Sequence, residues 1–205
     1  MTCIIVAHDV ICPWCWVGRI QAKRLQKEFP SLQILWKGYE LLPEGLPYPS
    51  HPANPDAEKK PRTPTRFQLM LAAEGLVLPK RERDVCNSRL ALEGAEYART
   101  EGRQEAYLDA LYQAYWEEDR DIADRAVLLD IAESAGLSVS RFNHALEERQ
   151  FRESVVEFDD PAHAAGVWNV PTWMFTEEWV AEQPYSVLRD MMEKYVNESD
   201  NVPCD

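Results

Sequence analysis

The strongest constraint in this sequence is a pair of cysteines two residues apart, Cys12 and Cys15, where a strand pattern gives way to a helix pattern. The run before the pair, residues 3–8, is continuously apolar and rich in β-branched side chains, which is typical of a strand buried on both faces. From Cys12 to Phe29 the spacing predicts a helix that Pro30 ends. The pair therefore stands at the start of a helix that directly follows a buried strand.

This position favours thiol chemistry. With Cys12 at the N-cap, Pro13 is the first helical residue, where its missing N–H costs no hydrogen bond. The Cys12 sulfur can then accept a hydrogen bond from the N–H of Trp14 or Cys15 and lies at the positive end of the helix dipole. Because both effects favour the thiolate, we expect Cys12 to be the exposed nucleophile and Cys15, one turn further in, to resolve the mixed disulfide. Trp14 is expected to be a partly exposed contact for the substrate.

Other interpretations of the cysteines have less support. The chain has five, an odd number, which argues against a structural disulfide framework. A structural zinc site needs a second pair of ligands, and the sequence has no second closely spaced cysteine or histidine pair, so we expect no metal. Inert core cysteines remain an alternative. We expect Cys3 in the core of the first strand, and Cys86 and Cys204 as spectators.

Composition limits the choice of partners. The 205 residues carry a formal net charge of −13. Such a surface repels nucleic acid and anionic lipid, because binding either needs clustered lysines and arginines. No apolar stretch is long enough for a membrane span, and the first nine residues lack the basic region of a signal peptide. We therefore expect a cytoplasmic protein that binds neither nucleic acid nor membranes.

The rest of the chain reads as a second strand, a helical block and a return to strands. Residues 32–39 predict a strand parallel to the first, and the prolines of 43–64 predict a long extended loop. Residues 65–158 look helical throughout. The last elements are two strands, 172–175 and 179–181, and a helix over 184–195.

Several residues mark the boundaries and contacts of the predicted helices. Gly75 and Gly136 are expected to end helices, and Asp124 and Ser140 to cap them. A seam of small side chains should let another helix approach closely: Ala91, Gly94, Ala95 and Ala98. We therefore divide the chain into one domain of residues 1–42 and 160–205, an inserted helical domain of residues 65–158, and a connecting loop, 43–64.

A second motif, Val170-Pro171-Thr172, comes directly before a predicted strand, where a proline is tolerated. Together with Cys12-Pro13-Trp14-Cys15, preceded by an Asp and followed by an aromatic and a Gly, it resembles the active-site residues of the DsbA-like oxidoreductases of the FrnE type. The likeness runs over nearly the whole chain. It implies an α/β thioredoxin-like fold with a helical domain inserted between its βαβ and ββα halves.

The resemblance also implies a site. Pro171 would be cis and pack beside the cysteine pair, and the backbone of Val170 would pair with a bound peptide or with glutathione. Substrates would be proteins or small molecules that carry a disulfide or thiol, with no tightly bound cofactor and glutathione as a potential co-substrate. The oligomeric state would be a monomer or a homodimer.

Related proteins leave two alternatives open. The 2-hydroxychromene-2-carboxylate isomerases and kappa-type glutathione transferases share the fold, but they usually carry Ser in place of Cys12, so the two cysteines favour redox chemistry. A non-catalytic binding module is the second alternative. This sequence departs from the family at Asn169, where Gly is frequent, and in having Cys204 alone where some members have a second cysteine pair.

Two polar residues precede the pair. His8 and Asp9 could tune or accept the proton of Cys12. A simpler interpretation is that His8 ends the strand and Asp9 forms a turn.

Overall fold

Five strands form one mixed sheet. The computed structural model describes residues 2–43 and 64–198. The strand order is β3-β2-β1-β4-β5, with β1 parallel to β2 and antiparallel to β4. The strands are β1 (Thr2–His8), β2 (Leu32–Glu40), β3 (Val156–Glu157), β4 (Thr172–Met174) and β5 (Trp179–Ala181). With α1 (Pro13–Glu28) between β1 and β2 and α8 (Tyr185–Glu198) after β5, this is the predicted α/β thioredoxin-like fold.

The central strand explains the apolar start of the sequence. β1 pairs with β2 along its whole length, with Ile4 opposite Ile34 and Val6 opposite Trp36. On its other edge it pairs with β4. Because helices and loops cover both faces, Val6 and Ala7 are fully buried, as a strand without polar alternation requires. The strand directs the chain straight into the loop before α1.

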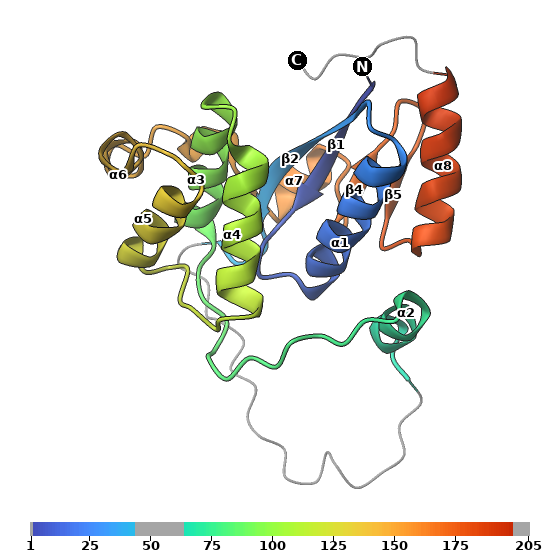
Figure 1. The fold of residues 1–205 in the computed structure, drawn as a ribbon, viewed down its shortest axis with the longest axis horizontal. Coiled ribbons are helices and arrows are strands. Elements are labelled where there is room, and N and C mark those ends of the chain that lie inside the picture. Colours follow the sequence, from blue (N-terminus) through green and yellow to red (C-terminus); the bar gives the residue numbers. More distant parts are fainter. Residues whose placement is uncertain (1, 44–63, 199–205) are drawn as a thin grey trace, which may run out of the picture.

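The remaining helices lie between β2 and β4 in the sequence. They are α2 (Arg66–Glu74), α3 (Arg89–Thr100), α4 (Gln104–Trp116), α5 (Arg125–Ser134), α6 (Val139–Glu147) and α7 (Asp160–Ala164), with a 3-10 turn at Arg152–Ser154. Figure 1 shows α3 to α6 gathered on the β2 side of the sheet, away from β4 and β5. Among them α3 packs against β2, and α2 stands near the start of α1. No helix in the described part of the chain is long and apolar enough to cross a membrane.

Three predictions about this region were wrong. Residues 75–88 contain no helix, and β3 extends the sheet where helix was expected, because two residues are too few to show a strand period. The N-cap of α6 is Ser138 rather than Ser140, since the extended backbone of Ser138 starts the helix two residues earlier. The short helix α7 was not predicted. Residues 44–63 of the expected proline-rich loop lie outside the described residues.

The other helix ends agree with the sequence. The Asp124 carboxylate accepts a hydrogen bond from the N–H of Ala126, 2.9 Å away, and caps α5. Gly75 and Gly136 follow α2 and α5 with φ of 66° and 76°, a backbone conformation that other residues seldom adopt.

The seam of small residues on α3 is a contact site for two other helices. A Cβ atom on Gly94 would lie 2.5 Å from the Tyr107 hydroxyl of α4 and 2.8 Å from Cζ of Phe142 of α6. Both rings are fully buried and cannot move aside. The inserted helices therefore pack around a position that only glycine can occupy.

We predict that Gly94→Ala lowers the free energy of unfolding by about 1–3 kcal/mol, the usual cost of overpacking a core, despite the better helix propensity of alanine. Urea denaturation followed by circular dichroism measures this change. Ala106→Ser on the exposed side of α4 adds one atom without a buried contact and is the control. An equal stability of Gly94→Ala and wild type would show that the helices can separate to accept a methyl group.

Candidate active site

The start of α1 presents the two cysteines. Cys12 is the N-cap residue with an extended backbone (φ −78°, ψ 121°), and Pro13 opens the helix as expected. The N–H of Cys12 donates to the carbonyl of Asp9, 3.2 Å away, which tightens the loop that leads into the helix. Cys15 lies one turn further along and is fully buried. Both cysteines are thiols in the structure.

The Val170-Pro171-Thr172 motif contacts the start of α1. Sγ of Cys12 donates a hydrogen bond to the carbonyl oxygen of Val170 over 3.4 Å, and the Val170–Pro171 peptide bond is cis, as the family resemblance implies. A Cβ on Gly18 would lie 3.1 Å from Cγ of Pro171. The glycine thus lets the proline ring rest on the first turns of α1. Residues 158 positions apart form one site.

Two expectations about Cys12 were wrong. Its side chain makes no capping hydrogen bond to Trp14 or Cys15, because the thiol points to the Val170 carbonyl instead. Cys12 is also only 6% exposed, since the Val170 loop covers it. The thiol of Cys12 therefore lies below the surface rather than on it.

Trp14 is half-buried and is covered by α2, a contact that no sequence pattern predicts. Its ring meets Phe67 edge-on, with centroids 4.9 Å apart, and the Arg66 guanidinium lies 5.6 Å from the ring centre. The first turn of α2 therefore forms one wall next to the cysteine pair.

A buried carboxylate fixes the other end of α2. Glu74, the last residue of the helix, accepts hydrogen bonds from Arg24 at 2.6 Å, from the N–H of Tyr185 at 2.6 Å and from Gln21 at 3.2 Å. It thereby joins α2 to α1 and to the start of α8. No local pattern in the sequence predicts these contacts, because the three partners of Glu74 are 50 or more residues away from it.

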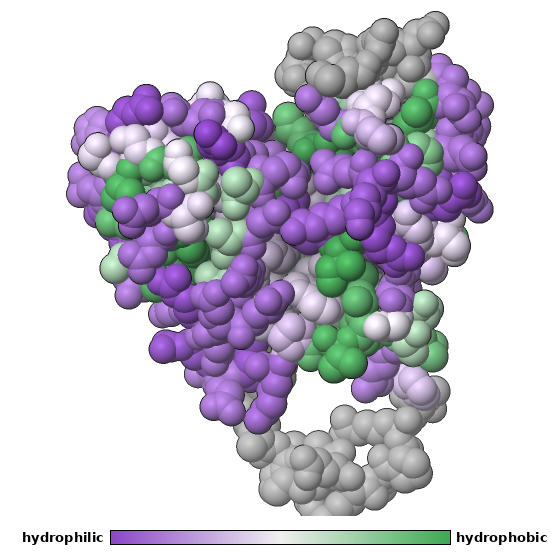
Figure 2. All heavy atoms as spheres, viewed as in Figure 1, coloured by the Kyte–Doolittle hydropathy of each residue, from purple (hydrophilic) through white to green (hydrophobic). Residues whose placement is uncertain are grey.

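An apolar surface continues from the pair along α1. Figure 2 shows this apolar area on a face that is otherwise mostly hydrophilic. Between α1 and α4 lies a groove of about 300 Å³. It is lined by Trp16, Ile20 and Tyr112 and by polar or charged side chains: Arg19, Lys23, Asp109, Gln113 and Glu117.

Asp9 lies completely buried under the site. Its carboxylate accepts hydrogen bonds from the N–H of Leu41 at 2.8 Å, the hydroxyl of Ser88 at 2.9 Å and the N–H of Ile11 at 3.3 Å. Burial raises its pKa to about 7, although these three donors oppose the rise. Asp9 also acts on Cys15, where its charge adds to the rise in the thiol pKa that burial causes.

Burial acts on the neighbouring groups as well. It raises the pKa of Cys15 well above its ordinary value, and the contact with Cys12 adds to the rise. The pKa of His8 falls to about 3 because the ring is buried and the Arg19 guanidinium is near. His8 is therefore neutral at pH 7, with Nδ1 3.1 Å from the Tyr112 hydroxyl.

The raised pKa of Asp9 predicts a pH-dependent stability. Between the ordinary pKa of 3.8 and about 7, the folded protein binds a proton that the unfolded chain releases, so stability falls as the pH rises through this window. The slope is about 1.4 kcal/mol per pH unit at its steepest. We expect the free energy of unfolding of Asp9→Asn, measured by urea denaturation at pH 5 to 8, to lack this slope. Parallel curves for the two proteins would refute the titration of Asp9.

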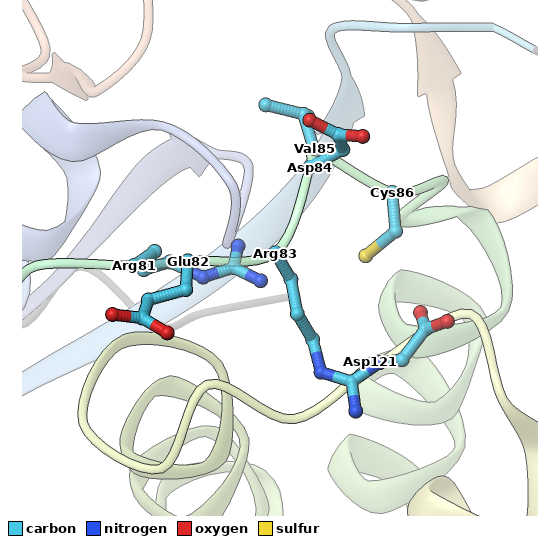
Figure 3. A pocket seen from close by; sticks show the side chains of 7 residues that line it. All are labelled: Arg81, Glu82, Arg83, Asp84, Val85, Cys86 and Asp121. Atoms are coloured by element: carbon cyan, nitrogen blue, oxygen red, sulfur yellow. The ribbon is translucent and has the colours of Figure 1, made fainter.

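Cys86 occupies a separate cavity. The cavity has a volume of about 350 Å³, and Figure 3 shows the Cys86 sulfur pointing into it, with Asp121 reaching in from the loop before α5. Burial and the hydrogen-bonded carboxylate of Asp121 raise the pKa of Cys86 to about 11. Its thiol is therefore protonated at neutral pH and a weak nucleophile.

We predict that Cys86 resists alkylation. A rise in pKa from 9.0 to about 11 leaves roughly a hundredfold less thiolate at pH 8 than an unperturbed thiol has. Iodoacetamide labelling read by mass spectrometry should therefore be slow at this position and should accelerate as the pH approaches 11. Asp121→Asn removes the nearby negative charge and should accelerate labelling at pH 8. Rapid labelling of the unmodified protein at pH 8 would contradict the raised pKa of this thiol.

Among residues 2–43 and 64–198, no group of three or more histidine, cysteine, aspartate or glutamate side chains is placed to hold a metal ion.

The helix-start thiol pair beside a cis-proline loop, on a thioredoxin-like sheet, defines the class of DsbA-like thioredoxin domains.

Comparison with known proteins identifies the family. The profile of the DSBA-like thioredoxin domain matches residues 3–193, so the chain belongs to this family. It is 28% identical over 204 residues to the uncharacterized protein YwbO of Bacillus subtilis, a match that covers 95% of this chain and 96% of YwbO.

Two solved structures show the same fold. A probable DsbA oxidoreductase of Streptomyces coelicolor, SCO1869, superposes with a TM-score of 0.75 at 22% identity, covering 100% of this chain and 94% of that one. A 2-hydroxychromene-2-carboxylate isomerase superposes with a TM-score of 0.67 at 19% identity, covering 96% and 98%. At these identities the likeness concerns the fold.

Proposed function

We propose that the protein is a thiol–disulfide oxidoreductase that works through Cys12 and Cys15. The observation that carries this proposal is the arrangement of the pair: a thiol at the helix start, in contact with the Val170 carbonyl, and a second thiol buried one turn behind it. Membership of the DSBA-like family supports the same chemistry.

The reaction has two exchange steps. The Cys12 thiolate attacks one sulfur of a substrate disulfide, so that a mixed disulfide forms and the other substrate sulfur leaves as a thiolate. Cys15 then loses its proton and attacks Cys12, which releases the second substrate thiol. The substrate gains two electrons and the protein becomes the Cys12–Cys15 disulfide. The reverse sequence oxidises a dithiol.

Asp9 is suited to handle the proton of Cys15. Its pKa of about 7 allows a part of the molecules to carry a free carboxylate at neutral pH, and its charge influences the pKa of the Cys15 thiol. His8 is a poorer candidate because its lowered pKa leaves it a weak base.

The walls of the site provide contacts for the substrate. When Cys12 becomes part of a disulfide it loses its S–H, and the carbonyl of Val170 is then free to accept a hydrogen bond from the backbone of a bound chain. Pro13 and Trp14 on one side, with Pro171 and Thr172 on the other, frame the sulfur. We propose a disulfide- or thiol-carrying protein or small molecule as substrate, in the cytoplasm, with glutathione as a co-substrate.

A redox titration tests the proposal. In mixtures of reduced and oxidised glutathione, thiol trapping and mass spectrometry should show one two-electron transition confined to Cys12 and Cys15. Cys15→Ser should accumulate mixed disulfides, and Cys12→Ser should form none. Cys86→Ser is the matched control and should titrate like the wild type.

Other results would replace the proposal. If the pair never forms a disulfide and glutathione only stays attached to Cys12, a glutathione-dependent isomerase or transferase is the better interpretation. If neither cysteine changes and Cys15→Ser alters nothing, the fold serves as a binding scaffold.

A further inference from the structure

An exposed tryptophan precedes the Val170 carbonyl by two residues in the chain. Trp168 is 66% exposed, the most exposed of the described tryptophans. It lies two residues before Val170, whose carbonyl contacts Cys12. Because two residues span at most about 7 Å, the Cα atom of Trp168 lies within that distance of the Cα atom of Val170.

The indole is held in place rather than left loose. It stacks on the imidazole of His163 with centroids 4.5 Å apart and planes 17° from parallel, and His163 in turn meets Phe158 edge-on at 6.0 Å. The neighbouring Val167 is fully buried and anchors the segment. With one face on His163 and most of the side chain exposed, the other face is open to a ligand.

Carboxylates occur in the segments next to Trp168 and its ring partner. Asp159 and Asp160 precede His163 by about one helical turn at the start of α7. Trp179 of β5 packs on Gly166, 3.3 Å from where its Cβ would be, and the exposed Glu177 and Glu178 directly precede Trp179 in the chain. The whole chain adds a net charge of −13.

We infer that Trp168 forms a cation–π subsite that takes a lysine or arginine side chain adjacent to the reacting cysteine of a polypeptide disulfide. A cation over an indole face is attracted by the ring quadrupole, and acidic surroundings concentrate cationic partners. This inference rests on the proposed function and names the substrate class within it.

Single-turnover kinetics test the inference. The reduced Cys15→Ser protein is mixed with short peptides whose one cysteine is disulfide-linked to 2-mercaptoethanol and is flanked by arginine, leucine or glutamate. Mass spectrometry follows formation of the mixed disulfide with Cys12. At low salt we expect the arginine peptide to react about two- to fivefold faster than the leucine peptide, and the glutamate peptide to be slowest.

Two substitutions separate the ring from the general field of the protein. Trp168→Leu keeps an apolar side chain but removes the ring, so the preference for arginine over leucine should fall to the level that the overall charge produces. Trp168→Phe keeps a weaker ring and should retain part of it. An arginine-to-leucine ratio that is the same in wild type and Trp168→Leu, or a faster leucine peptide, would overturn the inference.

The neutral bis(2-hydroxyethyl) disulfide separates this failure from that of the proposed function. If it forms a mixed disulfide with Cys12 while the peptides show no dependence on Trp168, only the subsite is wrong. If it and all peptides fail to react, the oxidoreductase proposal fails, and the subsite fails with it.

Discussion

The contact between the Val170–Pro171 loop and the start of α1 organises the molecule. Cys12 donates its S–H to the Val170 carbonyl, and Gly18 provides the space in which Pro171 rests. One side of the contact belongs to the β1–α1 unit and the other to the chain as it enters β4, which pairs with β1. The pairing of β4 with β1 therefore also brings the Val170–Pro171 loop to the start of α1 and forms the site.

Asp9 ties the inserted helices to the same place. Its buried carboxylate links the loop before α1 to the end of β2 through Leu41 and to the start of α3 through Ser88. Trp116 of α4 adds a second link, since its indole N–H donates to the carbonyl of Val10 over 2.8 Å. Helices α3 and α4 therefore help to hold the loop that leads to the cysteines.

The parts of this fold that could be predicted from sequence are those with local causes. The apolar run of β1, the proline at the start of α1 and the cap at Asp124 each depend on neighbouring residues, and the structure has them where the pattern indicated. The same holds for the position of Cys12 at the N-cap, while the domain division stays a prediction.

What the sequence could not provide depends on residues far apart in the chain. The thiol of Cys12 turns to Val170 instead of capping its own helix, and Glu74 holds α2 through Arg24 and Tyr185. No spacing in the sequence predicts either of these two contacts. The two-residue strand β3 is defined only by its pairing with β2.

The unequal burial of the two sulfurs sets the order of the proposed reaction. Cys15 is fully buried and its raised pKa keeps the proton on, so it is unsuited to attack a substrate first. Cys12 lies at the start of α1, and its S–H donates a hydrogen bond to the Val170 carbonyl. Formation of a mixed disulfide removes that S–H and leaves a buried carbonyl without its donor, at a cost unless the substrate supplies an N–H. Formation of the mixed disulfide therefore favours a hydrogen bond from a substrate N–H to the Val170 carbonyl. This bond would hold the substrate until Cys15 attacks the Cys12 sulfur.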